Sequence, residues 1–148
     1  MARAYAGIIE ANAAYNLLKS DSSCCIIDVR TSAEITFVGA PNLADAKNRY
    51  CLIEWQLFPT MQKNDKFVEQ LNAQLAEWEQ QDGIQSQDRP LLFLCRSGVR
   101  SEFAAEVATQ MGCTKCYNIV GGFEGDPDIN GHRAKVSGWQ FLNLPWSQ

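Results

Sequence analysis

The chain has 148 residues, of which 46% are hydrophobic and 20% charged, and its formal net charge at pH 7 is -4. This length and composition are typical of a globular protein with its own core, so we expect one domain over residues 1–148. The negative net charge argues against a nucleic acid or an anionic membrane as the main partner.

The N-terminal segment decides how the six cysteines are interpreted. Its apolar residues are interrupted by Glu10, Asn12 and Asn16, so it lacks the continuous apolar core of a signal peptide. No other stretch is long enough to span a bilayer. We therefore expect a cytoplasmic protein whose thiols stay reduced, with one reactive cysteine, Cys95, and five cysteines without a chemical role.

Apolar residues recur with helical spacing in some segments and form short unbroken runs in others. The predicted helices include residues 11–18, 67–78 and 103–111, and the predicted strands are residues 24–27, 50–53, 91–94 and 116–120. Strands that alternate with helices indicate an α/β fold with a mainly parallel sheet flanked by helices on both faces. Ligands of such sheets bind beyond the carboxyl ends of the strands. The aromatic tail over residues 137–148 is expected to pack back on the body.

The loop Cys95–Ser101 joins the strand at 91–94 to the helix that follows. Free backbone N–H groups and the helix dipole favour negative charge at such a position. A cysteine there should lose its proton readily, and the thiolate is the nucleophilic form. The loop therefore predicts a nucleophile at Cys95. Its anion-binding cradle would consist of Arg96, Ser97, Gly98, Val99, Arg100 and Ser101, with Gly98 adopting the positive φ of a tight curl.

Three segments in order resemble the rhodanese-like family of sulfurtransferases: Ile27–Arg30 with Glu34, the loop Cys95–Ser101, and Tyr117–Phe123. The resemblance covers roughly residues 8–125 and implies the rhodanese-like fold. It implies that Cys95 takes a sulfur atom from a donor such as thiosulfate, becomes a persulfide, and passes the sulfur to cyanide, a thiol or a protein. Neither a metal nor an organic cofactor is required.

Within this scheme the two loop arginines would have different roles. Arg100 can hold the thiolate or the sulfonate end of a donor, and Arg96 can guide anions to the mouth of the site. A histidine that the family often carries after the glutamate is absent, because the chain reads Phe37–Pro41 there. We therefore expect no acid–base histidine.

Four residues outside the loop are predicted to line or support the pocket. Asp28 follows a strand end and either faces the site or belongs to an ion pair. We favour the second interpretation, in which Arg30 pairs with Glu34 or Asp28 and fixes the loop between them. Phe123, which follows two glycines, either lines the pocket or is a core aromatic.

Two other functions remain open. Loops of Cys-x5-Arg phosphatases and of arsenate reductases also hold a tetrahedral oxyanion, but only four residues separate Cys95 from Arg100. A shorter loop makes a tighter cradle, which favours one extra sulfur over a phosphate. The third possibility is a non-catalytic interaction or redox module that retains the fold.

Three further features are expected to be structural. Cys113 and Cys116 have CxxC spacing, but no second pair stands nearby to complete a zinc site, and we interpret them as incidental thiols. His132, the one histidine, is interpreted as a surface residue. Residues 54–59 either shape the entrance for the acceptor or cover the sheet, and we favour the second.

Overall fold

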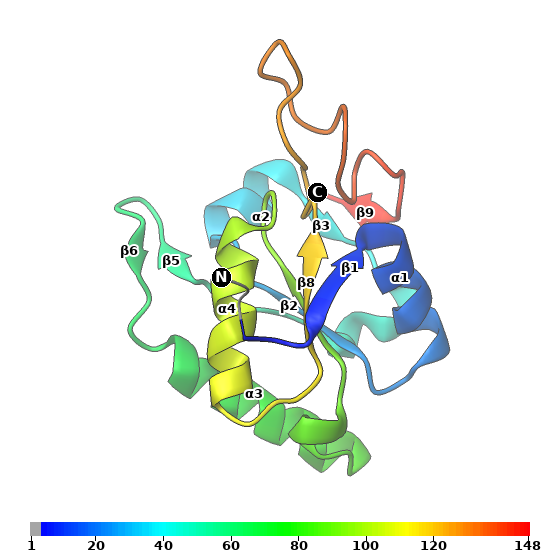
Figure 1. The fold of residues 1–148 in the computed structure, drawn as a ribbon, viewed down its shortest axis with the longest axis vertical. Helices are drawn as coiled ribbons and strands as arrows, with labels where there is room; N and C mark the ends of the chain where they lie inside the picture. The colour runs from blue at the N-terminus through cyan, green and yellow to red at the C-terminus, as the bar shows by residue number, and fades with distance from the viewer. Residues whose placement is uncertain (1–3) are drawn as a thin grey trace.

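The computed structural model describes residues 4–148, and at its centre lies a five-stranded parallel sheet (Figure 1). The strand order is β1-β8-β7-β2-β4, and every neighbouring pair is parallel. The strands are β1 (Gly7–Glu10), β2 (Cys25–Asp28), β4 (Tyr50–Leu52), β7 (Leu91–Leu94) and β8 (Cys116–Val120). The mainly parallel α/β sheet predicted from the sequence is confirmed.

The four predicted strands all exist, with ends that differ by at most one residue, but β1 was missed. It lies at the edge of the sheet and pairs with β8 alone. Its side chains alternate between partly exposed and exposed, and Ile8 is 64% exposed. Four residues with half their side chains in water leave no apolar run to detect.

Four α-helices accompany the sheet in the described part of the chain: α1 (Ala11–Ser20), α2 (Ser32–Val38), α3 (Phe67–Asp82) and α4 (Val99–Gln110). Helix α2 was not predicted, because none of its residues is buried and it has no apolar stripe. Its first turn is fixed locally. The Thr31 hydroxyl accepts a hydrogen bond from the Glu34 N–H, and the Glu34 carboxylate accepts one from the Thr31 N–H.

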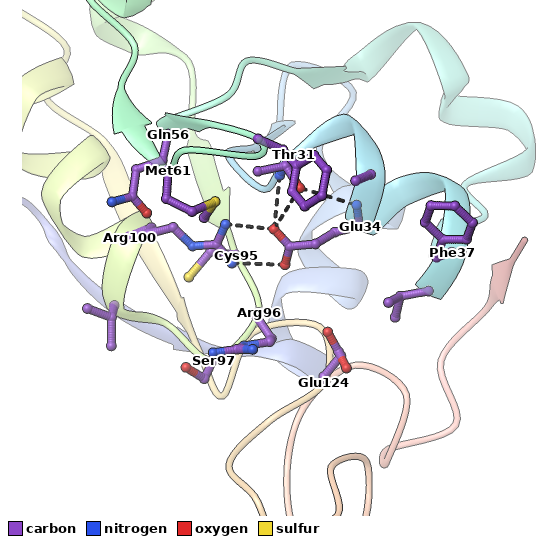
Figure 2. A pocket seen from close by; sticks show the side chains of 14 residues that line it. Thr31, Glu34, Phe37, Gln56, Met61, Cys95, Arg96, Ser97, Arg100 and Glu124 are labelled. Atoms are coloured by element: carbon purple, nitrogen blue, oxygen red, sulfur yellow. Dashed lines mark hydrogen bonds and ion pairs between the residues drawn. The ribbon is translucent and has the colours of Figure 1, made fainter.

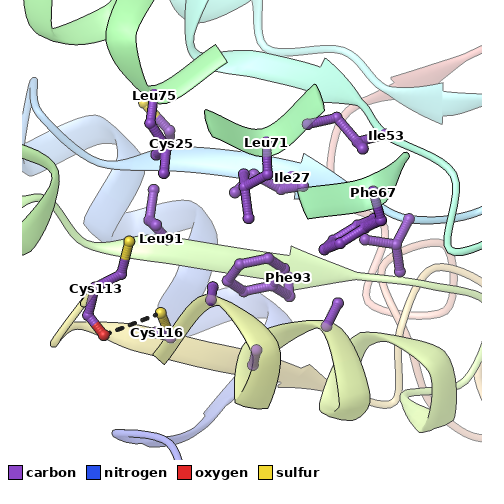
Figure 3. Close-up of a cluster of buried hydrophobic side chains, with 14 of the residues drawn as sticks. Cys25, Ile27, Ile53, Phe67, Leu71, Leu75, Leu91, Phe93, Cys113 and Cys116 are labelled. Carbon is purple, nitrogen blue, oxygen red and sulfur yellow. Dashed lines mark hydrogen bonds between the residues drawn. The ribbon is translucent and has the colours of Figure 1, made fainter. Parts of the chain in front are cut away.

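Alternate residues of the central strands point to opposite faces of the sheet and bury different helices. Cys25 and Ile27 pack with α3 and α4, as Figure 3 shows, whereas Cys24 and Ile26 pack with α1. The buried residues of α3 include Leu71. The prediction of helices on both faces of the sheet is confirmed.

The remaining regular segments are short. Strand β3 (Ala40–Pro41) pairs with β9 (Trp146–Ser147), β5 (Gln56–Leu57) pairs with β6 (Gln62–Lys63), and the 3-10 helices are η1 (Ala44–Arg49) and η2 (Ser86–Asp88). Trp139 in the tail is fully buried, and its indole N–H donates to the carbonyl of Pro145 at 2.8 Å. The tail thus packs on the body as predicted, although Phe141 stays 46% exposed. No helix within residues 4–148 is both long and apolar enough to cross a membrane.

Candidate active site

A cavity of about 700 Å³ lies beside the carboxyl end of β7 (Figure 2). Five of the seven residues of the predicted loop line it: Cys95, Arg96, Ser97, Val99 and Arg100. Further wall residues come from α2 and from the hairpin formed by β5 and β6. The structure therefore brings the predicted loop to a cavity at the edge of the sheet where ligands of parallel α/β folds bind.

Cys95 is the cysteine among the residues that line this cavity. Its side chain is almost fully buried, and its sulfur accepts a hydrogen bond from the backbone N–H of Gly98 at 3.1 Å. Gly98 has φ of +110° and is the N-cap of α4, so the curl and the start of the helix coincide. L side chains rarely adopt this backbone conformation, which explains the need for glycine there. The Gly98 N–H, at the N-terminus of α4, thus points to the position where a sulfur anion would form.

A chain of hydrogen bonds connects the thiol to β8. Asn118 donates from Nδ2 to the Gly98 carbonyl at 3.0 Å, which leaves its Oδ1 as an acceptor. The Ser101 hydroxyl donates to that Oδ1 at 2.6 Å, and its oxygen lies 3.2 Å from Cys95 Sγ. Because a hydroxyl has one proton, the Cys95 thiol is the donor to Ser101 in this arrangement. Rotation of that hydroxyl would instead direct its proton at the sulfur of a thiolate.

Asn118 was not singled out by the sequence analysis, and neither was Gly122. Asn118 could have been identified as a polar residue within the otherwise apolar strand predicted at residues 116–120. Gly122 lies against the loop, and a Cβ added there would lie 2.5 Å from the Cys95 carbonyl oxygen. The two residues after Gly122 hold the loop through backbone hydrogen bonds. The Phe123 N–H donates to the Cys95 carbonyl at 2.8 Å, and the Glu124 N–H donates to the Arg96 carbonyl at 2.9 Å.

Arg100 and Glu34 form a two-point ion pair across the cavity. The guanidinium donates to both carboxylate oxygens, at 2.7 and 2.9 Å, and the two side chains are 15% and 20% exposed. Of the two partners predicted for Arg30, Glu34 and Asp28, the structure shows Asp28. Arg96, by contrast, is exposed at the mouth. Arg100 faces the site as expected, but its terminal nitrogens already bind Glu34.

We expect this ion pair to make the stability of the protein depend on pH. Burial alone would raise the pKa of Glu34, but hydrogen bonds from Arg100 and Thr31 outweigh it and lower the pKa from 4.5 to about 2. The folded state thus favours the carboxylate, and the resulting stability is present above pH 4.5 and lost as the pH falls towards 2. We expect Glu34→Gln to lower the free energy of unfolding by about 1–2 kcal/mol at pH 7, since solvent screens the pair in part.

Urea unfolding at a series of pH values checks this expectation. The difference between the wild type and Glu34→Gln should shrink as the pH falls from 5 to 2, because protonation removes the same charge from the wild type. A difference that stays constant over this range would contradict the role of the Glu34 carboxylate. Asp82 is the control site, because its pKa is also lowered, chiefly by its hydrogen bond from Arg89. Asp82→Asn should leave unchanged the contribution that Glu34 makes to the free energy of unfolding.

Asp28, Arg30 and Phe123 lie beneath the cavity rather than in its wall. The Arg30 guanidinium binds Asp28 at 2.7 Å, with both side chains fully buried, and the Tyr50 hydroxyl donates to the same carboxylate at 2.6 Å. The guanidinium carbon lies 4.3 Å from the ring centre of fully buried Phe123. The suggestions that Asp28 faces the site and that Phe123 lines it are therefore wrong, while a supporting role fits both.

The segment 54–59 is divided between the core and the wall of the cavity. Trp55 covers the core, with its ring 5.0 Å from that of Phe67. Gln56 and Phe58 line the cavity instead, and Met61 from the same hairpin joins them. The preferred interpretation, that the whole segment covers the sheet, is wrong for Gln56 and Phe58.

The other five cysteines are buried or partly buried. Burial raises the pKa of Cys24 to about 12 and that of Cys25 to about 11, and it also raises the pKa of Cys51. Cys113 and Cys116 are buried in the core with α3 and α4, and Cys116 donates to the Cys113 carbonyl at 3.6 Å (Figure 3). His132 is exposed, as predicted.

Comparison with known proteins decides the family. The model of the rhodanese-like domain matches residues 10–126. The chain belongs to the rhodanese-like family. An uncharacterized protein of Rickettsia rickettsii is 36% identical over 133 residues, which are 90% of each chain.

Two solved structures share the fold. The crystal structure of Rv0390 from M. tuberculosis has a TM-score of 0.84 and 39% identity, and the match covers 98% of this chain and 99% of that one. The polysulfide-sulfur transferase homodimer of Wolinella succinogenes has a TM-score of 0.61 and 19% identity, covering 95% and 77%. The rhodanese-like fold predicted from the three sequence segments is confirmed.

Proposed function

We propose that this protein is a sulfurtransferase that carries sulfur as a persulfide of Cys95. One observation carries the proposal: the Cys95 sulfur lies at the cavity, at the N-terminus of α4, with the Gly98 N–H 3.1 Å away. Membership of a family that generally consists of sulfurtransferases supports it, and the Wolinella protein of the same fold is a polysulfide-sulfur transferase.

The first half-reaction loads the cysteine. With thiosulfate as donor, the Cys95 thiolate attacks the outer sulfur, the bond between the two sulfurs of thiosulfate breaks, and sulfite leaves with the electron pair. The proton of the thiol passes to solvent, after which the Ser101 hydroxyl can turn its own proton to the sulfur. The terminal sulfur of the persulfide is an anion, which the N–H groups of the loop and the dipole of α4 stabilise.

The second half-reaction unloads it. A thiolate or cyanide acceptor attacks the terminal sulfur, the bond between that sulfur and Cys95 Sγ breaks, and the Cys95 thiolate is regenerated. Neither half-reaction needs an oxidant or a histidine base. The small donor and the thiol or protein acceptor therefore react with the enzyme one after the other at Cys95.

Steady-state kinetics test this order of events. We expect initial rates over a grid of thiosulfate and cyanide concentrations to give parallel double-reciprocal lines, which is the pattern of a covalent intermediate. Intersecting lines would contradict this order, in which the persulfide forms and sulfite leaves before the acceptor binds. An aryl phosphate serves as the control substrate, because its Cys95-dependent hydrolysis would favour a phosphatase instead.

A further inference from the structure

The cavity over Cys95 is larger than the simplest sulfur donors and acceptors require. Its volume of about 700 Å³ lies within the range of pockets that bury drug-sized ligands, roughly 300–1,000 Å³. Cyanide or thiosulfate, with two and five heavy atoms, would fill a small part of it. The space therefore fits an acceptor with a substantial carbon skeleton.

Exposed apolar side chains from several elements surround the mouth of this cavity. Phe37 on α2 is 78% exposed, Phe58 between β5 and β6 is 62% exposed, and Val99 at the start of α4 is 65% exposed. Met61 adds a thioether from the hairpin, and Figure 2 shows Met61 and Phe37 among the side chains around the cavity. Single exposed apolar residues are ordinary, but a group that surrounds one reactive sulfur marks a binding site for an apolar ligand.

The charges along the same wall cancel. In the described part of the chain the charged lining residues are Arg96, Arg100, Glu34 and Glu124, two of each sign. The terminal nitrogens of Arg100 are bound to Glu34 at 2.7 and 2.9 Å, so that arginine offers little to an incoming anion. An acceptor that carries a carboxylate would meet Glu34 and Glu124 with only Arg96 to offset them.

We propose that the natural acceptor is a thiol with an apolar or aromatic skeleton and no negative charge beyond the sulfur, seated against Phe37 and Phe58. This inference rests on the proposed function, because the acceptor thiolate attacks the terminal sulfur of the Cys95 persulfide. The bond from that sulfur to Cys95 Sγ breaks, a new sulfur–sulfur bond to the acceptor forms, and Cys95 leaves as the thiolate. The proton of the acceptor thiol goes to solvent.

Single-turnover transfer from the loaded protein tests this choice. The full chain is loaded with thiosulfate, freed of excess donor, and mixed with either 2-phenylethanethiol or 3-mercaptopropionate. Both are primary alkyl thiols, and each rate is divided by the rate of the same thiol with a small-molecule persulfide. We expect the corrected second-order rate constant to be at least about 10-fold higher for 2-phenylethanethiol.

Three variants locate the preference. Phe37→Ser and Phe58→Ser should each lower the ratio of the two rate constants at least about 3-fold, because each removes apolar surface from the mouth. Glu34→Gln should raise the corrected rate of 3-mercaptopropionate by a similar factor, because it leaves Arg100 unpaired. The control Ile129→Ser, at a side chain 99% exposed outside the cavity, should change nothing.

The outcomes separate this inference from the proposed function. Equal rates for the two thiols, a faster anionic thiol, or an apolar preference that survives both phenylalanine variants would overturn the choice of acceptor while the persulfide chemistry stands. A protein that cannot be loaded at all would overturn the proposed function and the acceptor with it.

Discussion

Replacing Cys95 with serine is expected to lower the rate of sulfur transfer from thiosulfate at least about 1,000-fold. Serine is nearly the same size and keeps an acceptor for the Gly98 N–H and a partner for Ser101, but its oxygen cannot carry the sulfur as a persulfide. The measurement is the initial rate of thiocyanate formation with cyanide as acceptor. The unfolding midpoint in urea should stay close to that of the wild type, which separates lost chemistry from lost structure.

The matched control is the same substitution at another cysteine. Cys51 is partly buried on β4, remote in sequence from the loop, and does not line the cavity. Cys51→Ser should keep its transfer rate within about 2-fold of wild type, since changes that leave the site intact act mainly on stability. A Cys95→Ser protein that retained a tenth of the wild-type rate would contradict the assignment of the sulfur carrier.

The second large effect is expected at the buried ion pair beneath the cavity. Asp28→Ala should lower the free energy of unfolding by about 3–5 kcal/mol, because it leaves the Arg30 guanidinium buried without its counter-charge. Both side chains are fully buried at a separation of 2.7 Å. The Tyr50 hydroxyl would lose its acceptor at the same time. Equilibrium unfolding in guanidinium chloride gives the difference.

A double variant shows whether charge is the cause. Asp28→Leu combined with Arg30→Met removes both charges and keeps apolar volume, so it should be less destabilised than Asp28→Ala alone. If the double variant proves as unstable as the single one, packing or the Tyr50 hydroxyl, rather than the unpaired guanidinium, determines the loss. A loss below about 1 kcal/mol for Asp28→Ala would argue against a tightly paired site.

Elements whose pattern lies in the local sequence were predictable. Strand β7 is an unbroken run of four apolar residues, Leu91–Leu94, and it is buried on both faces. The sequence alone places the cysteine after it at the carboxyl edge of the sheet, because a helix pattern follows directly. Membership of the family followed from segments that the topology brings together at one edge.

Elements that depend on tertiary contacts were not predictable. Helix α2 has no buried face, and its role is to hold Glu34 against Arg100, a residue 66 positions away along the chain. The sequence offered only Arg30 as a partner of that glutamate, and the packing of α2 beside the loop brings it to Arg100 instead. The same holds for Phe123: its position after two glycines leaves open whether it lines the pocket or lies in the core, and in the structure it is buried against the guanidinium of Arg30.

The intact mass of the protein after incubation with thiosulfate tests the central claim most directly. If Cys95 carries sulfur as a persulfide, a species heavier by one sulfur atom should form, disappear on addition of cyanide, and map to the peptide that contains Cys95. Cys95→Ser should remain at its original mass. A wild-type protein that gains no sulfur, or a Cys95→Ser variant that gains it equally, would contradict the claim.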